Sequence, residues 1–164
     1  MKELSYPTTR HQPPDIPDYS SIVERRRLTG PALRRFFKIM RRWKVDTKDA
    51  RLLLGGITSR RFKQLSTRPE GRILNQDQLL RVASVIAIDQ SLHKLLPQRQ
   101  ADQWAQTPSR QFRGGTPLYN MLAGGALTLW EWRQSLDQRV SESRAAEREK
   151  QTKTPINRSQ KESR

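Results

Sequence analysis

The sequence predicts an all-α protein, and two features of its pattern support this fold class. Large apolar residues recur at spacings of three and four through most of residues 29–140, as they do on the buried face of a helix. Segments that contain Gly and Pro separate these stretches, and none of them alternates apolar with polar residues as a half-buried strand does. We therefore expect short helices in two small units, between extended or disordered termini.

The first helix is expected to begin at Thr29, whose hydroxyl can cap it, with Gly30 and Pro31 in the first turn. Its apolar residues share one face, and basic residues occupy the rest of the circumference. The apolar face consists of Leu33, Phe36, Phe37, Met40 and Trp43. The basic arc consists of Arg34, Arg35, Lys38, Arg41 and Arg42.

Two shorter helices should follow, over residues 47–54 and from residue 58 or 59, with Gly55-Gly56 between them. A helix, a glycine turn and a second helix form the outline of a helix-turn-helix motif, whose second helix lies in the major groove of DNA. The register is open. With Gly56 as the turn glycine, Leu52 occupies a position where a small residue is usual; with Ala50 as that small residue, the turn comes late.

Positive charge is concentrated on this region of the chain. Residues 25–68 contain fifteen Lys and Arg but only Asp46 and Asp49, which gives +13 of the chain's net charge of +16. Such a field on one small unit is typical of proteins that bind a phosphate backbone. We therefore expect a nucleic acid as a partner.

The third helix is suited to reading bases, because Arg binds guanine through two hydrogen bonds and Gln can bind adenine. Its outward side chains, with Phe62 and Leu65 facing inward, are Ser59, Arg60, Arg61, Lys63 and Gln64. The basic arc of the first helix, namely Arg34, Arg35, Lys38, Arg41 and Arg42, is better suited to phosphates. The alternative interpretation of both sets is a solvated basic surface.

A longer helix should begin at Asn75, where Gln78 completes a variant of the capping box, and end before Pro97. Its buried stripe is predicted to contain Leu79, Val82, Ala83, Ile86, Leu92, Leu95 and Leu96. Further helices are expected over residues 101–106, from Pro117 to Gly124-Gly125, and over residues 127–140.

The two ends of the chain differ from the rest in composition. The first 24 residues form a Pro-rich segment that should be extended, with Pro7, Pro13, Pro14 and Pro17. Residues 141–164 consist almost entirely of charged, Ser, Thr and Gln residues, which predicts a basic flexible tail. No apolar stretch is long enough to span a membrane, no signal-peptide core is present, and cysteine is absent. These features favour a cytoplasmic protein, associated with the nucleoid when bound to DNA.

Little in the sequence indicates catalysis. His11 and His93 are isolated, and the acidic residues are not paired at the spacing of metal ligands. Gly114-Gly115 and Gly124-Gly125 lack the strand context of phosphate-binding loops. We expect no enzyme activity, no cofactor and no metal.

Five aromatic residues gather within residues 104–132, namely Trp104, Phe112, Tyr119, Trp130 and Trp132. Large aromatic residues often form the core of a small helical unit. Leu129, Trp132 and Leu136 share one stripe of the last helix, whereas Trp130 points elsewhere. Trp130 is therefore equally compatible with a core position and with a contact to a partner.

Two segments and a series of single residues carry a family resemblance. The segments are Ala-Arg-Leu-Leu-Leu-Gly-Gly-Ile-Thr at 50–58 and Leu-Asn-Gln-Asp-Gln-Leu-Leu-Arg at 74–81. The single residues are, in order, Trp104, Phe112, Gly114-Gly115, Pro117-Leu118, Met121, Gly124 or Gly125, Arg133 and Leu136. With these elements, residues 28–139 resemble the Xre–MbcA–ParS family of bacterial type II antitoxins. The chain departs from that pattern at Ser109, where Asn is common, at Trp132, where a small aliphatic residue is usual, and in its basic tail.

The resemblance implies an Xre-like helix-turn-helix domain over residues 25–97 and a helical toxin-binding domain over residues 98–140. The implied partners are operator DNA, usually bound by a homodimer, and a cognate RES-domain toxin that consumes NAD. The implied toxin-binding residues are Trp104, Phe112, Gly114, Gly115, Pro117, Trp130 and Arg133. Such an antitoxin neutralises its toxin by direct binding and represses its own operon.

Two other functions are compatible with the same sequence. One is a stand-alone transcriptional regulator whose second unit only dimerises, and the other is a non-specific RNA-binding protein.

Overall fold

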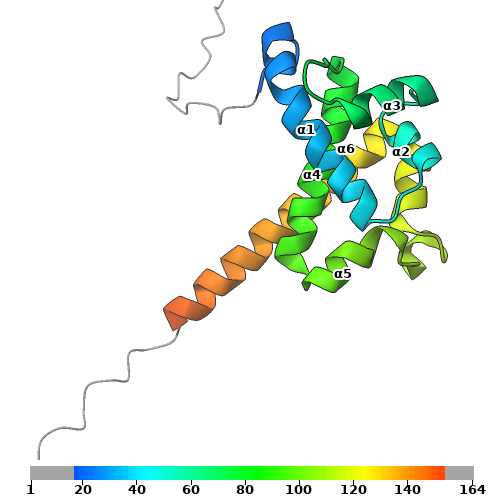
Figure 1. Ribbon diagram of the computed structural model, residues 1–164. Coiled ribbons are helices and arrows are strands. Elements are labelled where there is room, and N and C mark those ends of the chain that lie inside the picture. The colour runs from blue at the N-terminus through cyan, green and yellow to red at the C-terminus, as the bar shows by residue number, and fades with distance from the viewer. Residues whose placement is uncertain (1–16, 154–164) are drawn as a thin grey trace, which may run out of the picture.

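The computed structural model describes residues 17–153, and helices make up most of this range (Figure 1). The α-helices are α1 (Ile22–Arg42), α2 (Thr47–Leu53), α3 (Ser59–Thr67), α4 (Gln76–Leu95), α5 (Gln98–Gln103) and α6 (Pro117–Lys153). Two short 3-10 helices, η1 (Trp104–Gln106) and η2 (Arg110–Phe112), lie between α5 and α6. Residues 17–153 contain no strand, which confirms the all-α class.

Helix α4 lies at the centre of the bundle, packed against both α1 and α6 (Figure 1). A helix between two neighbours has to be apolar on more than one face. The single predicted stripe was therefore incomplete: Val85 and Ile88 are fully buried, whereas Ala83 and Ile86 are only partly buried.

One hydrophobic core runs through the two units predicted from the sequence. It includes Leu33 of α1, Leu92 of α4 and Met121 of α6, all with at most 1% of their surface exposed. Ring contacts also join the units, because the Trp43 and Trp104 centroids lie 6.3 Å apart. The packing of α1, α4 and α6 therefore holds the basic residues 25–68 in a fixed position relative to the aromatic residues 104–132.

Helix α1 begins earlier than the sequence predicted. Ser21 is its N-cap and accepts a hydrogen bond from the backbone N–H of Glu24, so Thr29 and Pro31 lie inside the helix. Thr29 is completely buried, and its hydroxyl donates to the Arg25 carbonyl oxygen at 2.6 Å. The prediction of a helix start at Thr29 was wrong. It relied on the preference of Thr and Pro for a first turn, whereas the Thr29 hydroxyl forms its hydrogen bonds inside the bundle.

Helices α2 and α3 have the expected caps. Asp46 accepts the N–H of Asp49 at 2.8 Å, and Thr58 accepts the N–H of Arg61 at 3.2 Å. The turn between the helices covers residues 54–58, with both glycines at positive φ. Of the two residues considered for the small position of the motif, Ala50 is buried and Leu52 is 46% exposed.

Helix α4 begins with the predicted capping box: Asn75 accepts the N–H of Gln78 at 2.8 Å, and the Gln78 side chain accepts the N–H of Asn75 at 3.1 Å. The helix predicted over residues 101–106 is displaced toward the amino end, as α5 followed directly by η1.

Helix α6 consists of two helices joined at Gly125, whose φ of 63° and ψ of −144° are not helical. This break lies where Gly124-Gly125 predicted one. The second part continues past Val140 to Lys153 and extends away from the bundle (Figure 1). The expectation of a flexible tail from Ser141 was therefore wrong for residues 141–153, because this segment is rich in the strong helix formers Ala, Glu, Lys and Arg.

The remaining parts of the Pro-rich segment and of the basic tail, residues 1–16 and 154–164, lie outside the described range. Within residues 17–153, no helix combines the length and the apolar character needed to cross a membrane.

Candidate nucleic-acid interface and partner surface

Helix α3 is anchored by apolar contacts on one side and exposes polar residues on the other. Leu65 is fully buried, and Phe62 packs edge-on against Phe37 of α1 with ring centroids 5.4 Å apart. Ser59, Arg60 and Lys63 are exposed, and Gln64 is half-buried. Four of the five predicted base-reading residues therefore lie where the sequence pattern put them, on the side away from the core or at its edge.

Arg61, the fifth of these residues, has a different environment. It is half-buried, and its Nη2 donates to the carbonyl oxygen of Ile73 at 3.3 Å. A second arginine supports the turn itself, since Arg51 Nε donates to the Ile57 carbonyl oxygen at 2.8 Å. Both guanidinium groups hold backbone segments next to α3, and neither contact was expected from the sequence.

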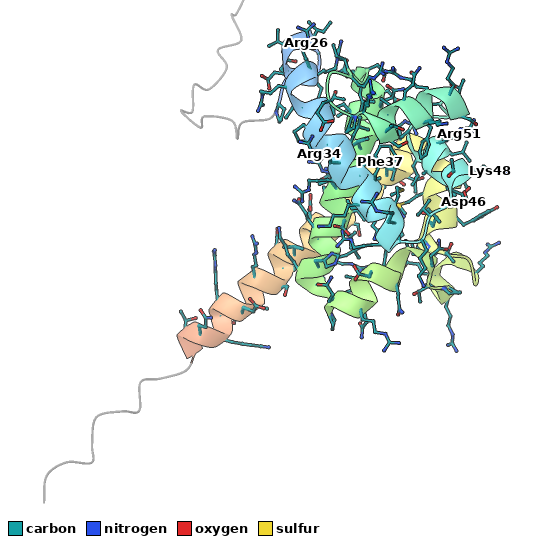
Figure 2. The ribbon with its side chains drawn as sticks, in the orientation of Figure 1. Arg26, Arg34, Phe37, Asp46, Lys48 and Arg51 are labelled. Atoms are coloured by element: carbon teal, nitrogen blue, oxygen red, sulfur yellow. The ribbon has the colours of Figure 1, made fainter. Side chains whose placement is uncertain are left out.

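The outer face of α1 presents the predicted phosphate-binding residues Arg34, Arg35, Lys38 and Arg41, all of which are exposed. In Figure 2, the labelled cations extend from Arg26 near the amino end of α1, through Arg34, to Lys48 of α2. Arg34 forms an ion pair with Glu70 in the loop after α3. The α1 residues on this face thus border the same region as α3.

Arg42 does not belong to this outer face. Its Nη2 lies 2.6 Å from Asp89 Oδ2, and its Nη1 lies 3.7 Å from Asp102 Oδ1. Position 42 faces α4 and α5, where the guanidinium neutralises a carboxylate that is 91% buried. These contacts give Arg42 a structural role, and its contact with DNA phosphates stays a prediction.

His93 completes this cluster. Its Nδ1 lies 2.8 Å from the Asp89 carbonyl oxygen, and its Nε2 lies 3.0 Å from Asp102 Oδ1. The histidine thus links α4 to α5. Neither this cluster nor any other set of His, Asp or Glu side chains within residues 17–153 is grouped so that it could hold a metal ion.

At the amino end of α1, Arg27 donates to both carboxylate oxygens of Glu24, at 2.7 and 3.3 Å. These hydrogen bonds lower the pKa of the Glu24 carboxyl below its ordinary value. A carboxylate in the first turn also interacts favourably with the helix dipole. Arg27 is therefore engaged within the helix, whereas Arg26 forms no ion pair with any residue of 17–153.

Sequence reasoning missed two basic residues of this surface, Arg68 and Arg72. Together with Arg60, Lys63, Gln64 and Thr67 they line a pocket of about 330 Å³ beside α3. The positive charge of residue 68 and the glycine at position 71 were visible in the sequence, but the turn that brings Arg72 back toward α3 was not.

In the second unit, three of the predicted partner residues are buried or partly buried. Trp132 packs edge-on against Trp104 with centroids 4.9 Å apart and lies 5.4 Å from Phe112, and its Nε1 donates to Asn120 Oδ1 at 2.9 Å. Pro117 at the start of α6 is buried. Trp104, Phe112 and Pro117 thus support the local fold.

The other four predicted partner residues lie nearer the surface. Gly114 is exposed with a φ of 85°, Gly115 is half-buried in the same loop, and Arg133 is half-buried with its Nε 4.0 Å from Asp137 Oδ2. Trp130 is 55% exposed, so it is not a core residue.

Besides Trp130, two further large apolar side chains of α6 are exposed. Tyr119 is 70% exposed and Leu127 is 65% exposed, on either side of the break at Gly125. Large apolar residues exposed along one helix are typical of protein-binding surfaces. We name Tyr119, Leu127 and Trp130 the α6 patch.

Comparison with known proteins places the chain in a family. Its sequence is 30% identical over 106 residues to "Uncharacterized protein y4oB" of Sinorhizobium fredii (strain NBRC 101917 / NGR234), and the match covers 64% of this chain and 81% of the rhizobial protein. The chain belongs to the y4oB family. No family model and no solved structure matches the sequence. The name of the y4oB relative assigns no activity to it.

Proposed function

We propose that the protein is the antitoxin of a type II toxin–antitoxin system. It binds the operator of its own operon through α2 and α3, and it neutralises a RES-domain toxin through residues 98–140. The proposal that the protein binds DNA rests on α3. This helix is capped, is anchored by Phe62 and Leu65, and bears Arg60 and Lys63 on its outer side.

The geometry supports DNA binding in two ways. The side chains at the start of α3 are free to contact base edges, as in helix-turn-helix proteins. Arg35, Lys38 and Arg41 on α1 are exposed and form no ion pair within residues 17–153, so they can neutralise phosphates. A homodimer on a palindromic or repeated operator, in the cytoplasm and on the nucleoid, fits this role.

Binding to promoter DNA from the same operon tests this half, measured by fluorescence anisotropy at several salt concentrations. Arg60→Ala should reduce the preference for the operator over random DNA, since each good base contact contributes about 1–3 kcal/mol of discrimination. Lys38→Ala should weaken binding to both DNAs equally and reduce the salt slope by about 1. Equal effects of the two variants on random DNA would contradict these assignments.

The antitoxin half is supported by the α6 patch and by the family resemblance of residues 98–140. Because Trp130 is exposed and large, it is suited to anchor a protein partner. Co-expression of the chain with the adjacent gene, scored by growth and by co-purification, tests the idea. The antitoxin hypothesis is wrong if the neighbouring protein is toxic and the chain neither restores growth nor co-purifies with that protein.

The α6 patch also favours a second candidate, a stand-alone regulator whose second unit only dimerises. The same three exposed side chains can pack against a second copy of the chain. A dimer that Trp130→Ala dissociates, without any partner encoded next to the gene, would favour this candidate. Sedimentation velocity distinguishes the two states.

A further inference from the structure

The pocket beside α3 combines four cations with no acidic partner. Its lining consists of Arg60, Lys63, Gln64, Thr67, Arg68 and Arg72, and it has a volume of about 330 Å³. None of the four basic side chains forms an ion pair with a carboxylate of residues 17–153. Like charges held close together are unfavourable unless an anion neutralises them.

The local structure holds these cations on one side of α3. Arg60 and Gln64 are four residues apart and lie in one row along α3, and Arg68, the C-cap, continues this row with its N–H bonded to the Gln64 carbonyl oxygen. Lys63 and Thr67 form the adjacent row. The two rows provide three of the four cations.

Arg72 reaches the same pocket because the chain reverses after α3. The N–H of Arg72 lies 3.4 Å from the carbonyl oxygen of Pro69, and Gly71 has a φ of 74°, as at the third position of a type II turn. Glu70, the acidic residue of this turn, is paired with Arg34. The turn therefore adds a cation to the pocket while its carboxylate is neutralised elsewhere.

The donors of the pocket favour an anion with several oxygen atoms. Arginine donates through a planar fork that matches phosphate, and lysine adds a point charge. The Thr67 hydroxyl donates to the Lys63 carbonyl oxygen at 2.7 Å, so its proton is not available to a ligand. The guanidinium groups, the Lys63 ammonium and the Gln64 amide are therefore the donors that face the pocket.

We propose that this pocket binds phosphate groups, with Arg68 and Arg72 as its main ligands beside Lys63. The phosphates belong to a nucleic-acid backbone or to a free compound with linked phosphates. A backbone phosphate held by Arg68, Arg72 and Lys63 would lie against the carboxyl half of α3, which leaves Arg60 at the other end of the pocket to contact a base edge. The proposal requires phosphate binding alone and stands whether or not the protein recognises an operator.

The test compares two double variants of the full chain that remove the same charge. Arg68→Ala/Arg72→Ala empties the pocket of two cations, whereas Arg144→Ala/Arg148→Ala removes two exposed cations from the projecting part of α6. Binding of inorganic pyrophosphate is measured by calorimetry, and binding of a random-sequence DNA duplex by anisotropy over a range of salt. Thermal unfolding by circular dichroism shows that each variant is folded.

We expect the pocket variant to lose about tenfold or more in affinity, because each deleted guanidinium removes charge-assisted hydrogen bonds to the phosphate. The control variant should lose less than about twofold. Loss of duplex binding with a salt slope reduced by about 2 identifies the nucleic-acid backbone as the source of the phosphate. Loss of pyrophosphate binding alone identifies a free ligand. Equal losses in both double variants, or no loss in the pocket variant, would overturn the proposal, whereas a missing operator preference would affect only the function proposed above.

Discussion

The hydroxyl of Thr29 accepts a hydrogen bond from the backbone N–H of Leu74 at 3.1 Å, across 45 residues of sequence. Both residues are completely buried. The same hydroxyl donates its proton to the Arg25 carbonyl oxygen. Thr29 therefore joins α1 to the end of the loop that carries Arg68 and Arg72, and it satisfies a backbone donor that no solvent can reach.

Thr29→Val should destabilise the fold, because it removes the hydroxyl with both of its hydrogen bonds and leaves the Leu74 N–H buried without an acceptor. The expected loss is about 1–3 kcal/mol in the free energy of unfolding. Urea denaturation measures it. Thr29→Ser, which keeps the oxygen, should retain most of the stability, and equal losses in the two variants would show that the hydrogen bond is not the cause.

Replacement of Arg42 should affect stability in place of DNA affinity. In Arg42→Ala, the Asp89 carboxylate stays buried without its 2.6 Å partner, and breaking a fully buried pair costs about 3–5 kcal/mol. We expect a value toward the lower end, since Arg42 itself is 29% exposed. Urea denaturation gives the free energy of unfolding of this variant.

Arg35→Ala is the matched control for Arg42→Ala, because Arg35 is exposed on the outer face of α1. It should leave stability within about 0.5 kcal/mol of the parent and weaken binding to random DNA. If Arg42→Ala instead keeps its stability and loses DNA affinity, the original interpretation of Arg42 as a phosphate contact is correct.

Some helix ends could be predicted from the sequence, whereas the contacts of Thr29 and Arg42 could not. Spacing and capping rules located α2, α3 and the start of α4, because local hydrogen bonds at Asp46, Thr58 and Asn75 determine those ends. The roles of Thr29 and Arg42 depend on residues 45 and 47 positions away, and no local pattern contains that information.

The same limit applies to the candidate sites. Exposure of Arg60 and Lys63 followed from the helical period once Phe62 and Leu65 were assigned inward. Arg72 joined them only through a turn in the loop, whose conformation the residue pattern left open.

Trp130 and Trp132 should respond to substitution in opposite ways. Trp132→Ala removes a ring that packs against Trp104 and Phe112, and it should cost up to about 3–5 kcal/mol, the range for buried aromatic residues. Trp130→Ala should change stability by less than about 0.5 kcal/mol, because the side chain is 55% exposed. Thermal unfolding measures both. A large loss in Trp130→Ala would assign this residue to the core and remove it from the α6 patch.

The angle between the two parts of α6 depends on Gly125, and Gly125→Ala tests this dependence. A Cβ atom at Gly125 would meet no other atom within 4 Å, so there is space for the side chain. The backbone, however, has a φ of 63° and a ψ of −144°, a region that is open almost only to glycine. Straightening α6 would change the angle between the part that bears Tyr119 and the part that bears Trp130, or pull the buried Leu129 out of the core. We therefore expect the free energy of unfolding, measured by urea denaturation, to fall by about 1–3 kcal/mol, together with weaker binding of any partner at the α6 patch.

Ala126→Ser, at an exposed neighbouring position, is the control. A Gly125→Ala protein as stable as the parent would show that the two parts of α6 join without this strained backbone.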